Sequence, residues 1–231
     1  MIGPEFWRRY LKVYDVLNSL PTYRQLLADV CEELGVRENE LIMDAGSGTG
    51  NLALRIRGSG GKVVAIDYCR EALESHRSKD IHCSPVLADL ERGLPFKDNC
   101  FDKIASNNTL YAMSAVHQKS ALMELRRVLK TGGKIVLANP RRRLNFLRVS
   151  MNVISDSIRA EGFGTTARKM VASMPVMIMM AYYNRKLRTD NQHCFYDYEE
   201  QRDLLEDMGF RQVSQTKLIY SGQAVLNSAI K

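Results

Sequence analysis

The chain lacks most features of secreted or membrane-spanning proteins. Its five cysteines are an odd number with no Cys-x-x-Cys pair, so disulfides are not expected and a reducing compartment is the default. Its first residues, MIGPEFWRRY, lack the apolar run of a secretory signal. The apolar segment Met170 to Tyr183 is too short for a bilayer span of about 20 residues, and Pro175 interrupts it. We therefore expect a cytoplasmic protein that does not cross a membrane.

Metal-binding patterns and repeats are also scarce. His82-Cys83 and His193-Cys194 are pairs of adjacent residues, whereas ligands within each half of a structural zinc site are usually separated by about two to four residues. We expect no metal. The chain shows no internal repeat or low-complexity segment. Its 231 residues, 45% of them hydrophobic, are enough for one domain with a substantial core.

A glycine-rich turn joins a predicted strand to a predicted helix within Leu41 to Leu54, LIMDAGSGTGNLAL. The turn alternates glycines with small residues: Gly46, Ser47, Gly48, Thr49 and Gly50. Glycine is needed where a chain turns with positive φ and a ligand touches the backbone, and such a turn offers N–H groups to a nucleotide-like ligand. Asn51 stands where a dinucleotide fingerprint requires its third glycine, which disfavours a nicotinamide site.

Acidic residues end the next two predicted strands. The β-branched strand Lys62 to Ile66 is followed by Asp67, which lies 21 residues after Gly46, and an acid in this position accepts hydrogen bonds from ribose hydroxyls. Pro85 to Asp89 is a shorter apolar strand whose final acid suits an adenine amino group. The spacing therefore favours a nucleoside-containing ligand.

Two further segments complete an ordered set. A buried strand from Asp102 to Ser106 precedes the polar residues Asn107 and Asn108, and Glu124 to Pro140 contains an amphipathic helix, a Gly-Gly turn and a fifth strand. The set resembles the class I S-adenosylmethionine-dependent methyltransferases over roughly Leu41 to Pro140 and the C-terminal tail. Within them it is similar to the small-molecule enzymes related to ubiquinone and menaquinone biosynthesis methyltransferases.

The resemblance implies an α/β fold with a Rossmann-like, doubly wound, seven-stranded and mostly parallel sheet whose last strand is antiparallel. We expect a single methyltransferase domain over residues 1–231, with an N-terminal helical cap (1–40), a cofactor-binding core (41–140), a helical lid insertion (141–196), and a closing helix and strands (197–231). The elements predicted outside the glycine turn are helices at Glu5–Asn18, Thr22–Leu34, Val116–Leu129 and Tyr198–Met208, and closing strands at Phe210–Leu218 and Ala224–Ile230.

The resemblance also implies S-adenosylmethionine as the cofactor. The glycine turn would hold its methionine part, Asp67 the ribose and Asp89 the adenine, with Asn107 near the methionine end and the substrate. The residues expected to bind the cofactor are Asp44, Gly46, Ser47, Gly48, Gly50, Asp67, Tyr68, Asp89, Leu90 and Asn107.

All of the excess positive charge lies in the predicted lid. Residues 141–196 contain ten Lys or Arg against three Asp or Glu, whereas the rest of the chain carries 23 of each. The segment also holds six of the eleven methionines: Met151, Met170, Met174, Met177, Met179 and Met180. We expect two or three helices. Three interpretations are open: packed methionines under a solvated basic face, an adaptable wall for a bulky apolar substrate, or peripheral contact between the basic residues and an anionic membrane.

Nucleic acid is the rival partner suggested by a pI near 9.2. Clustered arginines suit phosphate binding, and Arg141, Arg142, Arg143 and Arg148 supply some. The chain has no room for an additional RNA-binding module, however. Asn107 is followed by Asn108, Thr109 and Leu110 in place of the Asn-Pro-Pro-Tyr type motif of exocyclic-amine methyltransferases. We expect a small-molecule acceptor, with no nucleic acid.

The implied chemistry is an in-line displacement at the methyl carbon of the sulfonium, which the cofactor itself activates. A general base is needed only where the acceptor loses its proton in the transition state. The sequence ranks no candidate above the others: Tyr14, Tyr111, His117, His193 and Tyr196. The acceptor atom and the oligomeric state stay open. The alternative functions are an RNA or protein methyltransferase and a cofactor-binding module without turnover.

Overall fold

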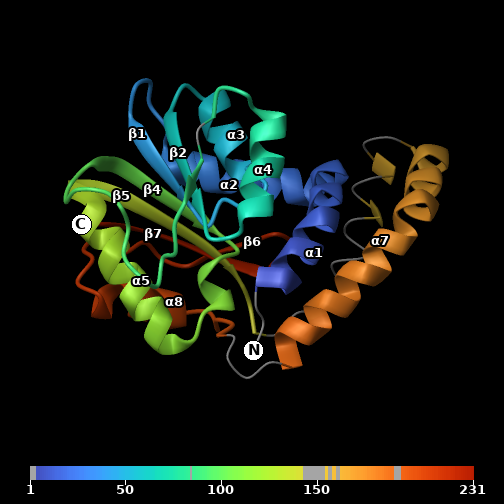
Figure 1. Ribbon diagram of the computed structural model, residues 1–231. Coiled ribbons are helices and arrows are strands. Elements are labelled where there is room, and N and C mark those ends of the chain that lie inside the picture. Colours follow the sequence, from blue (N-terminus) through green and yellow to red (C-terminus); the bar gives the residue numbers. More distant parts are fainter. Residues whose placement is uncertain (1–3, 84, 143–153, 156–157, 160–161, 190–193) are drawn as a thin grey trace.

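A seven-stranded sheet forms the centre of the computed structural model (Figure 1), which describes residues 4–83, 85–142, 154–155, 158–159, 162–189 and 194–231. The strand order is β3-β2-β1-β4-β5-β7-β6. The strands are β1 (Leu41–Ala45), β2 (Lys62–Asp67), β3 (Val86–Leu87), β4 (Phe101–Asn107), β5 (Leu129–Pro140), β6 (Lys217–Ile219) and β7 (Ala224–Ile230). Because β7 pairs antiparallel with both β5 and β6 while the other pairs are parallel, the predicted sheet is confirmed.

Helices flank this sheet on both faces and at one end (Figure 1). The helices are α1 (Pro4–Tyr14), η1 (Asp15–Ser19), α2 (Pro21–Leu34), α3 (Asn51–Gly58), α4 (Arg70–Lys79), η2 (Leu110–Ala112), α5 (Ala115–Val128), α7 (Phe163–Thr189) and α8 (Glu200–Asp207). Pro21 occupies the first turn of α2 and Gly35 closes that helix in a left-handed conformation, with φ 59°. Both are the residue types that favour a helix start and stop.

Two predicted boundaries are wrong. The expected strand Phe210 to Leu218 is reduced to β6, because Gln212 adopts φ 48° and breaks the extended conformation. Before β6, only Arg211 forms a bridge, to Ile230. The Gly-Gly turn expected before the fifth strand lies inside β5, where Gly132 has φ 77° and the pairing with β4 shifts register.

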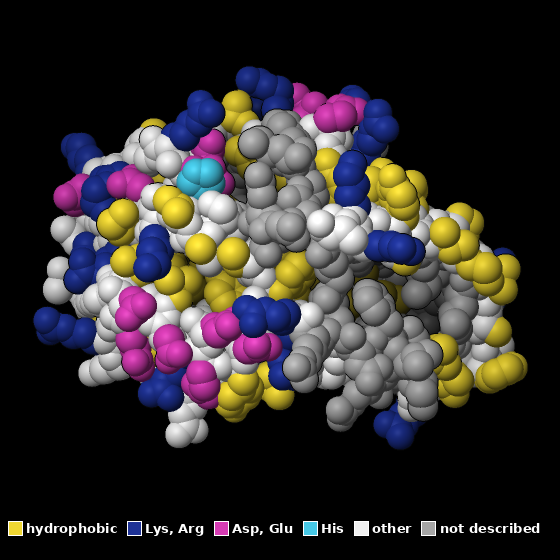
Figure 2. All heavy atoms as spheres, turned by 90° about the horizontal axis from the view of Figure 1, so that it is seen from below, with side chains coloured by type: hydrophobic (Ala, Val, Ile, Leu, Met, Phe, Trp, Pro, Cys, Tyr) yellow, Lys and Arg dark blue, Asp and Glu magenta, His cyan; other side chains and the backbone are white. Residues whose placement is uncertain are grey.

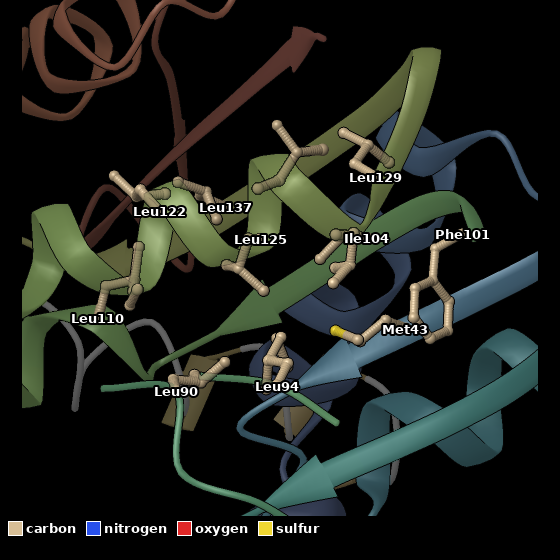
Figure 3. Packing of buried hydrophobic residues seen from close by; sticks show 14 of the residues in the cluster. Met43, Leu90, Leu94, Phe101, Ile104, Leu110, Leu122, Leu125, Leu129 and Leu137 are labelled. Carbon is tan, nitrogen blue, oxygen red and sulfur yellow. The ribbon is translucent and has the colours of Figure 1, made fainter. Parts of the chain in front are cut away.

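The core follows from the alternation of side chains along the strands. On one face of the sheet, buried residues from the strands pack with Leu122 and Leu125 of α5 (Figure 3). On the other face, residues from the same strands pack with Leu26 and Val30 of α2. The first face contains Met43, Ile104 and Leu137, and the second contains their neighbours Ile42, Ala105 and Val136. A sheet covered on both faces needs this continuous apolar sequence.

Helix α7 is the main described part of the predicted lid, and it lies beside α1 (Figure 1). It runs for 27 residues and continues through Pro175, so this proline interrupts the apolar sequence without ending the helix. A proline inside a helix removes one backbone hydrogen bond, and the helix is maintained around that defect. Among the residues that the structure describes, no helix is long and apolar enough to cross a membrane.

Candidate functional site

A cavity of about 700 Å³ lies at the carboxyl ends of the parallel strands. Its walls come from the glycine turn after β1, the ends of β2 and β4, the segment after β3, and helices α1, η1 and α2. Open α/β sheets bind ligands in this position, and the volume is that of a typical small-molecule site. The N-terminal cap therefore contributes to the site mainly through α1, whereas α2 also belongs to the core.

The glycine turn is anchored to β2. The N–H groups of Gly46 and Ser47 both donate to the carbonyl oxygen of Ile66, at 2.9 and 2.8 Å. A Cβ on Gly46 would lie 2.2 Å from Thr109 Cγ2, and a Cβ on Gly50 would lie 2.2 Å from His76 Cδ2. These two glycines are therefore required by packing within the protein.

Gly48 differs from the other two glycines. It has φ 54°, and a Cβ at this position would have Leu11 Cδ2 of α1 as its nearest neighbour, at 3.4 Å. Gly48 lines the cavity, whereas Gly50 is not among the described residues that line it. The positive φ favours glycine at this position, and the protein leaves space beside it on the cavity side.

Asp67 connects the end of β2 to the glycine turn. Its Oδ2 accepts a hydrogen bond from the Gly48 N–H and its Oδ1 accepts one from the Cys69 N–H, both at 2.8 Å. Burial raises the pKa of this carboxyl, and the backbone donors oppose that effect. Each carboxylate oxygen has two acceptor positions, so Asp67 retains capacity for a ligand hydroxyl while it holds the turn.

Three buried oxygens around the cavity lack a hydrogen-bond partner in the described part of the chain. They are Asp44 Oδ2, Ser47 Oγ and Asn107 Oδ1. Buried polar atoms nearly always have a partner, so unpaired acceptors on a cavity wall indicate a ligand with N–H or O–H donors. An amino acid ammonium group fits this set, and the methionine part of S-adenosylmethionine carries one.

Asp44 is the most buried carboxylate of the site, with 1% of its surface exposed. Burial raises its pKa to about 7, and the neighbouring Asp67 charge adds to that effect, while the Ala53 N–H lowers it. A group that is costly to ionise in the empty cavity becomes easier to ionise when a cation binds beside it.

The remaining predicted cofactor residues lie along the β3 side of the cavity. Tyr68, Asp89 and Leu90 all line it. Asp89 Oδ1 accepts the Glu91 N–H at 3.0 Å, and its Oδ2 lies 3.3 Å from Arg92 Nε. Nine of the ten predicted cofactor residues therefore line the same cavity, and Gly50 is the exception among the described residues.

A set of polar contacts fastens the cap to the glycine turn. Asp15 Oδ1 in η1 accepts hydrogen bonds from Thr49 Oγ1 at 2.5 Å and from Lys79 Nζ at 2.6 Å. Lys79 Nζ also donates to the Thr49 carbonyl at 2.9 Å and to Asn51 Oδ1 at 3.1 Å. We call this the Asp15–Thr49–Lys79 clasp. It ties η1, the glycine turn and α4 together at the edge of the cavity.

Aromatic side chains form another part of the cavity wall, which we call the aromatic wall. The cavity is lined by Trp7, Tyr10, Tyr14, Tyr23, Tyr111, Phe195 and Tyr220. Asn108, held at φ 54°, donates from Nδ2 to the Tyr14 hydroxyl at 3.0 Å. Burial raises the pKa of Tyr14, and it raises that of Tyr220 to about 12. Both phenols therefore stay protonated near neutral pH.

The structure shows which of the five catalytic candidates line the cavity. Tyr14, Tyr111 and His117 line the cavity. Tyr196 is buried in an aromatic cluster with Phe6 and Tyr10 and is not among the described lining residues, and burial raises its pKa. His193 lies outside the described residues.

His117 has a neighbour that sequence reasoning missed. Its Nδ1 lies 3.2 Å from Glu91 Oε2, and Glu91 follows Asp89 and Leu90 on the cavity wall. The pair therefore lies beside Asp89, on the side of the cavity where the adenine is expected. Sequence reasoning also missed the clasp and the role of Asn108, although an asparagine directly after a strand is a residue type that tolerates positive φ.

No group of three or more His, Cys, Asp or Glu in the described residues is arranged to hold a metal ion. His82 and Cys83 line a second, smaller cavity of about 250 Å³ beside α4. His193, half of the other pair considered for zinc, is outside the described residues.

Comparison with known proteins gives one matching family model, described as a methyltransferase domain, over residues 37–194. A demethylmenaquinone methyltransferase from Tropheryma whipplei (strain Twist) is 26% identical, over 98% of this chain and 90% of the relative. The ubiquinone/menaquinone biosynthesis C-methyltransferase UbiE of Proteus mirabilis is 29% identical, over 89% of this chain and 81% of the relative. A 2-phytyl-1,4-naphtoquinone methyltransferase from Synechocystis is 33% identical over 58% of this chain and 60% of the relative.

Solved structures show the same fold at lower identity. A SAM-dependent methyltransferase from Aquifex aeolicus superposes with a TM-score of 0.62 at 17% identity, covering 100% of this chain and 99% of that chain. A Haloferax volcanii methyltransferase, solved in complex with the activator Trm112, gives a TM-score of 0.65 at 18% identity with the same coverage.

Proposed function

The chain belongs to the methyltransferase domain family and is an S-adenosylmethionine-dependent methyltransferase, and from that premise we propose that its acceptor is a small, mostly apolar molecule with an aromatic or quinone-like ring. The observation that carries the proposal is the aromatic wall of the cavity. Its rings offer flat apolar surface, and its buried phenols offer hydrogen-bond donors to a ring oxygen. A quinone precursor suits this wall best, and a lipid, polyketide or other natural product of similar shape belongs to the same class.

We assign the cofactor residues as follows. Asp44 and Asn107 would accept hydrogen bonds from the ammonium group, the glycine turn would contact the methionine part, Asp67 would bind the ribose and Asp89 the adenine. The unpaired buried oxygens of Asp44, Ser47 and Asn107 support this assignment.

S-adenosylmethionine supplies a methyl group already activated on a sulfonium. The residues of this chain have to hold the acceptor in line with that methyl and keep water out. Such positioning is worth about 7–11 kcal/mol in well-oriented reactions. We propose that Tyr14, which Asn108 holds through a hydrogen bond, orients the acceptor by donating to an oxygen on its ring. Its raised pKa disfavours the phenolate that a base would require.

The affinity for S-adenosylmethionine is expected to rise with pH through about 7, the pKa of Asp44 in the cofactor-free protein. The bound cation favours the carboxylate, so binding below that pH must release a proton. Calorimetry at pH 6.5 in two buffers of different ionisation enthalpy measures this release. Asp44→Asn should weaken binding and abolish the release. If Asp44→Asn released as many protons as the wild type on binding S-adenosylmethionine, the assignment of Asp44 to the ammonium group would be wrong.

The raised pKa of Asp44 also makes the free energy of unfolding depend on pH. Its carboxyl titrates near 7 when folded, against a reference value of 3.8, so the folded chain binds more protons between these pH values. The contribution of Asp44 to the free energy of unfolding therefore falls as pH rises from about 4 to 7, by about 1.4 kcal/mol for each pKa unit. Asp44→Asn should raise the melting temperature of the cofactor-free protein more at pH 8 than at pH 5.

Tyr14→Phe is expected to raise the KM for a hydroxyl-bearing aromatic acceptor about tenfold, equivalent to one hydrogen bond of about 1.4 kcal/mol. The Kd for S-adenosylmethionine should not change. Tyr198→Phe is the matched control, because the Tyr198 hydroxyl donates to the Thr216 carbonyl at 2.9 Å and lies outside the described cavity wall. An unchanged KM in Tyr14→Phe would remove this tyrosine from acceptor binding.

A product assay tests the proposed acceptor class. The protein is incubated with S-adenosylmethionine and, separately, a demethylated naphthoquinol, a folded RNA and a protein extract, and methylated products are identified by mass spectrometry. Methylation of the quinol supports the proposal. Methylation confined to the RNA or the protein fraction would favour the alternative of a macromolecular substrate, and cofactor binding without any product would favour a non-catalytic module.

The proposal includes a cytoplasmic location, peripheral contact with an anionic membrane surface, and no nucleic acid partner. The surplus of basic residues in 141–196 supports the membrane contact. Arg142, however, is engaged with the body of the protein, since it forms ion pairs with Asp197 and Glu200, both at 2.8 Å. The residues for such contact are therefore sought elsewhere in the segment.

A further inference from the structure

Helix α7 has a row of large apolar side chains exposed to solvent. Four of them are more than half exposed: Val171 (68%), Met174 (51%), Ile178 (64%) and Tyr182 (63%). Their spacing of three or four residues places them on one side of the helix. We call them the α7 row. A contiguous exposed apolar surface of this kind marks a site of contact with something other than water.

The opposite side of α7 is already occupied. The Tyr183 ring lies 5.2 Å from the Phe6 ring and 5.7 Å from the Tyr10 ring of α1, both edge to face. Lys186 Nζ lies 5.6 Å from the centre of the Phe6 ring. These contacts fix which side of α7 faces the protein. The α7 row is therefore its outward side and is not part of the core.

The charge of α7 has one sign. Its 27 residues include five Lys or Arg and no Asp or Glu. Arg168 lies one turn before the α7 row and Arg185 lies one turn after it, and both are exposed. Figure 2 shows hydrophobic side chains on the surface at the end of the molecule that carries α7 in Figure 1, with Lys and Arg side chains beside them.

We propose that α7 binds the surface of an anionic lipid bilayer, with the α7 row inserted at the level of the headgroups and upper acyl chains and the basic residues on lipid phosphates. The exposed apolar side chains would reach the acyl chains, and the basic residues near the two ends of the α7 row would meet lipid phosphates. A second copy of this chain is a poorer occupant, because pairing two such helices would bring ten positive charges together without an acid.

The placement links the membrane to the cavity. Helix α1, which packs on the inner side of α7, lines the cavity with Trp7, Tyr10 and Tyr14. A membrane-bound α7 would hold this wall beside the lipid, where an apolar acceptor is concentrated. This consequence rests on the proposed function, whereas lipid binding itself does not.

Vesicle co-sedimentation tests the proposal directly. Wild-type protein should bind vesicles of phosphatidylcholine and phosphatidylglycerol in a 3:1 ratio about tenfold more tightly than pure phosphatidylcholine. Ile178→Asp should lower binding to the mixed vesicles about tenfold. Ile81→Asp is the matched control, since Ile81 is 84% exposed outside α7, and it should bind like wild type. The double variant Arg168→Gln/Arg185→Gln should lose the preference for anionic lipid, whereas Lys97→Gln/Lys119→Gln should keep it.

Further outcomes separate this proposal from the proposed function. Ile178→Asp should keep wild-type Kd for S-adenosylmethionine and wild-type turnover of a water-soluble acceptor. Wild-type lipid binding by Ile178→Asp would overturn the proposal. A dimer in sedimentation equilibrium that Ile178→Asp dissociates would assign the α7 row to a second copy and would also overturn it. Anionic vesicle binding by a protein that methylates none of the tested acceptors would support the α7 surface and leave only the proposed acceptor in question.

Discussion

Gly48→Ala is expected to weaken S-adenosylmethionine binding about 100-fold, or about 2.7 kcal/mol, in a protein that still folds. A Cβ at this position would extend into the cavity between the glycine turn and Leu11, where it meets nothing of the protein closer than 3.4 Å. The left-handed φ of 54° adds a strain of about 1–2 kcal/mol to the folded state. Calorimetry gives the affinity, and thermal unfolding followed by circular dichroism gives the stability.

Two other glycines provide the controls. Gly132 has φ 77° and nothing within 4 Å of a Cβ, so Gly132→Ala should show the same backbone strain with normal cofactor affinity. Gly46→Ala should destabilise the protein more than Gly48→Ala, because its Cβ would collide with Thr109. A folded Gly48→Ala protein with affinity within twofold of wild type would show that the cavity side of the turn does not contact the cofactor.

Asp67→Ala is expected to raise the Kd for S-adenosylmethionine by about 100-fold. Hydrogen bonds to a charged group contribute about 1.5–3 kcal/mol each, and the variant would lose both the ribose contacts and the acceptor that holds the Gly48 N–H. Asp67→Asn keeps one accepting oxygen and should fall between the wild type and Asp67→Ala. Titration calorimetry measures all three proteins.

Asp102→Ala is the matched control for a carboxylate that supports a backbone N–H. Asp102 accepts the Leu41 N–H at 2.8 Å and pairs with Lys130 at 2.6 Å, but it is not among the described residues that line the cavity. The Asp102→Ala substitution should lower stability without changing cofactor affinity. If Asp67→Ala changed the Kd no more than Asp102→Ala does, the ribose role would be wrong.

The parts of the fold and site that the sequence predicts are those encoded locally. Residue type and spacing are sufficient to place three features that are close along the chain: the strand Leu41–Ala45, the glycines after it, and Asp67 at the end of β2. The antiparallel last strand came from the family resemblance, since nothing in the residues of β7 specifies its direction. Gln212 shows the limit of pattern: an extended-looking segment is broken by one residue with positive φ.

The parts that the sequence does not predict depend on contacts between distant segments. Thr109 stands 63 residues after Gly46, yet its side chain explains why Gly46 carries no Cβ. The partner of His117 is Glu91, and that of Asn108 is Tyr14, 94 residues away. The direction that α7 faces is likewise set by the rings of α1. Such contacts form only when the fold brings distant segments together, so the spacing of residues along the sequence does not predict them.

The Asp15–Thr49–Lys79 clasp makes the attachment of the cap depend on the charges of two side chains. It joins η1 to the turn that is expected to hold the cofactor, so any movement of η1 away from that turn has to separate the Lys79–Asp15 ion pair. Lys79 and Asp15 are 25% and 33% exposed, so water and salt reach the pair and weaken it. The attachment of η1 to the glycine turn is therefore sensitive to ionic strength, whereas the buried sheet beneath it is not.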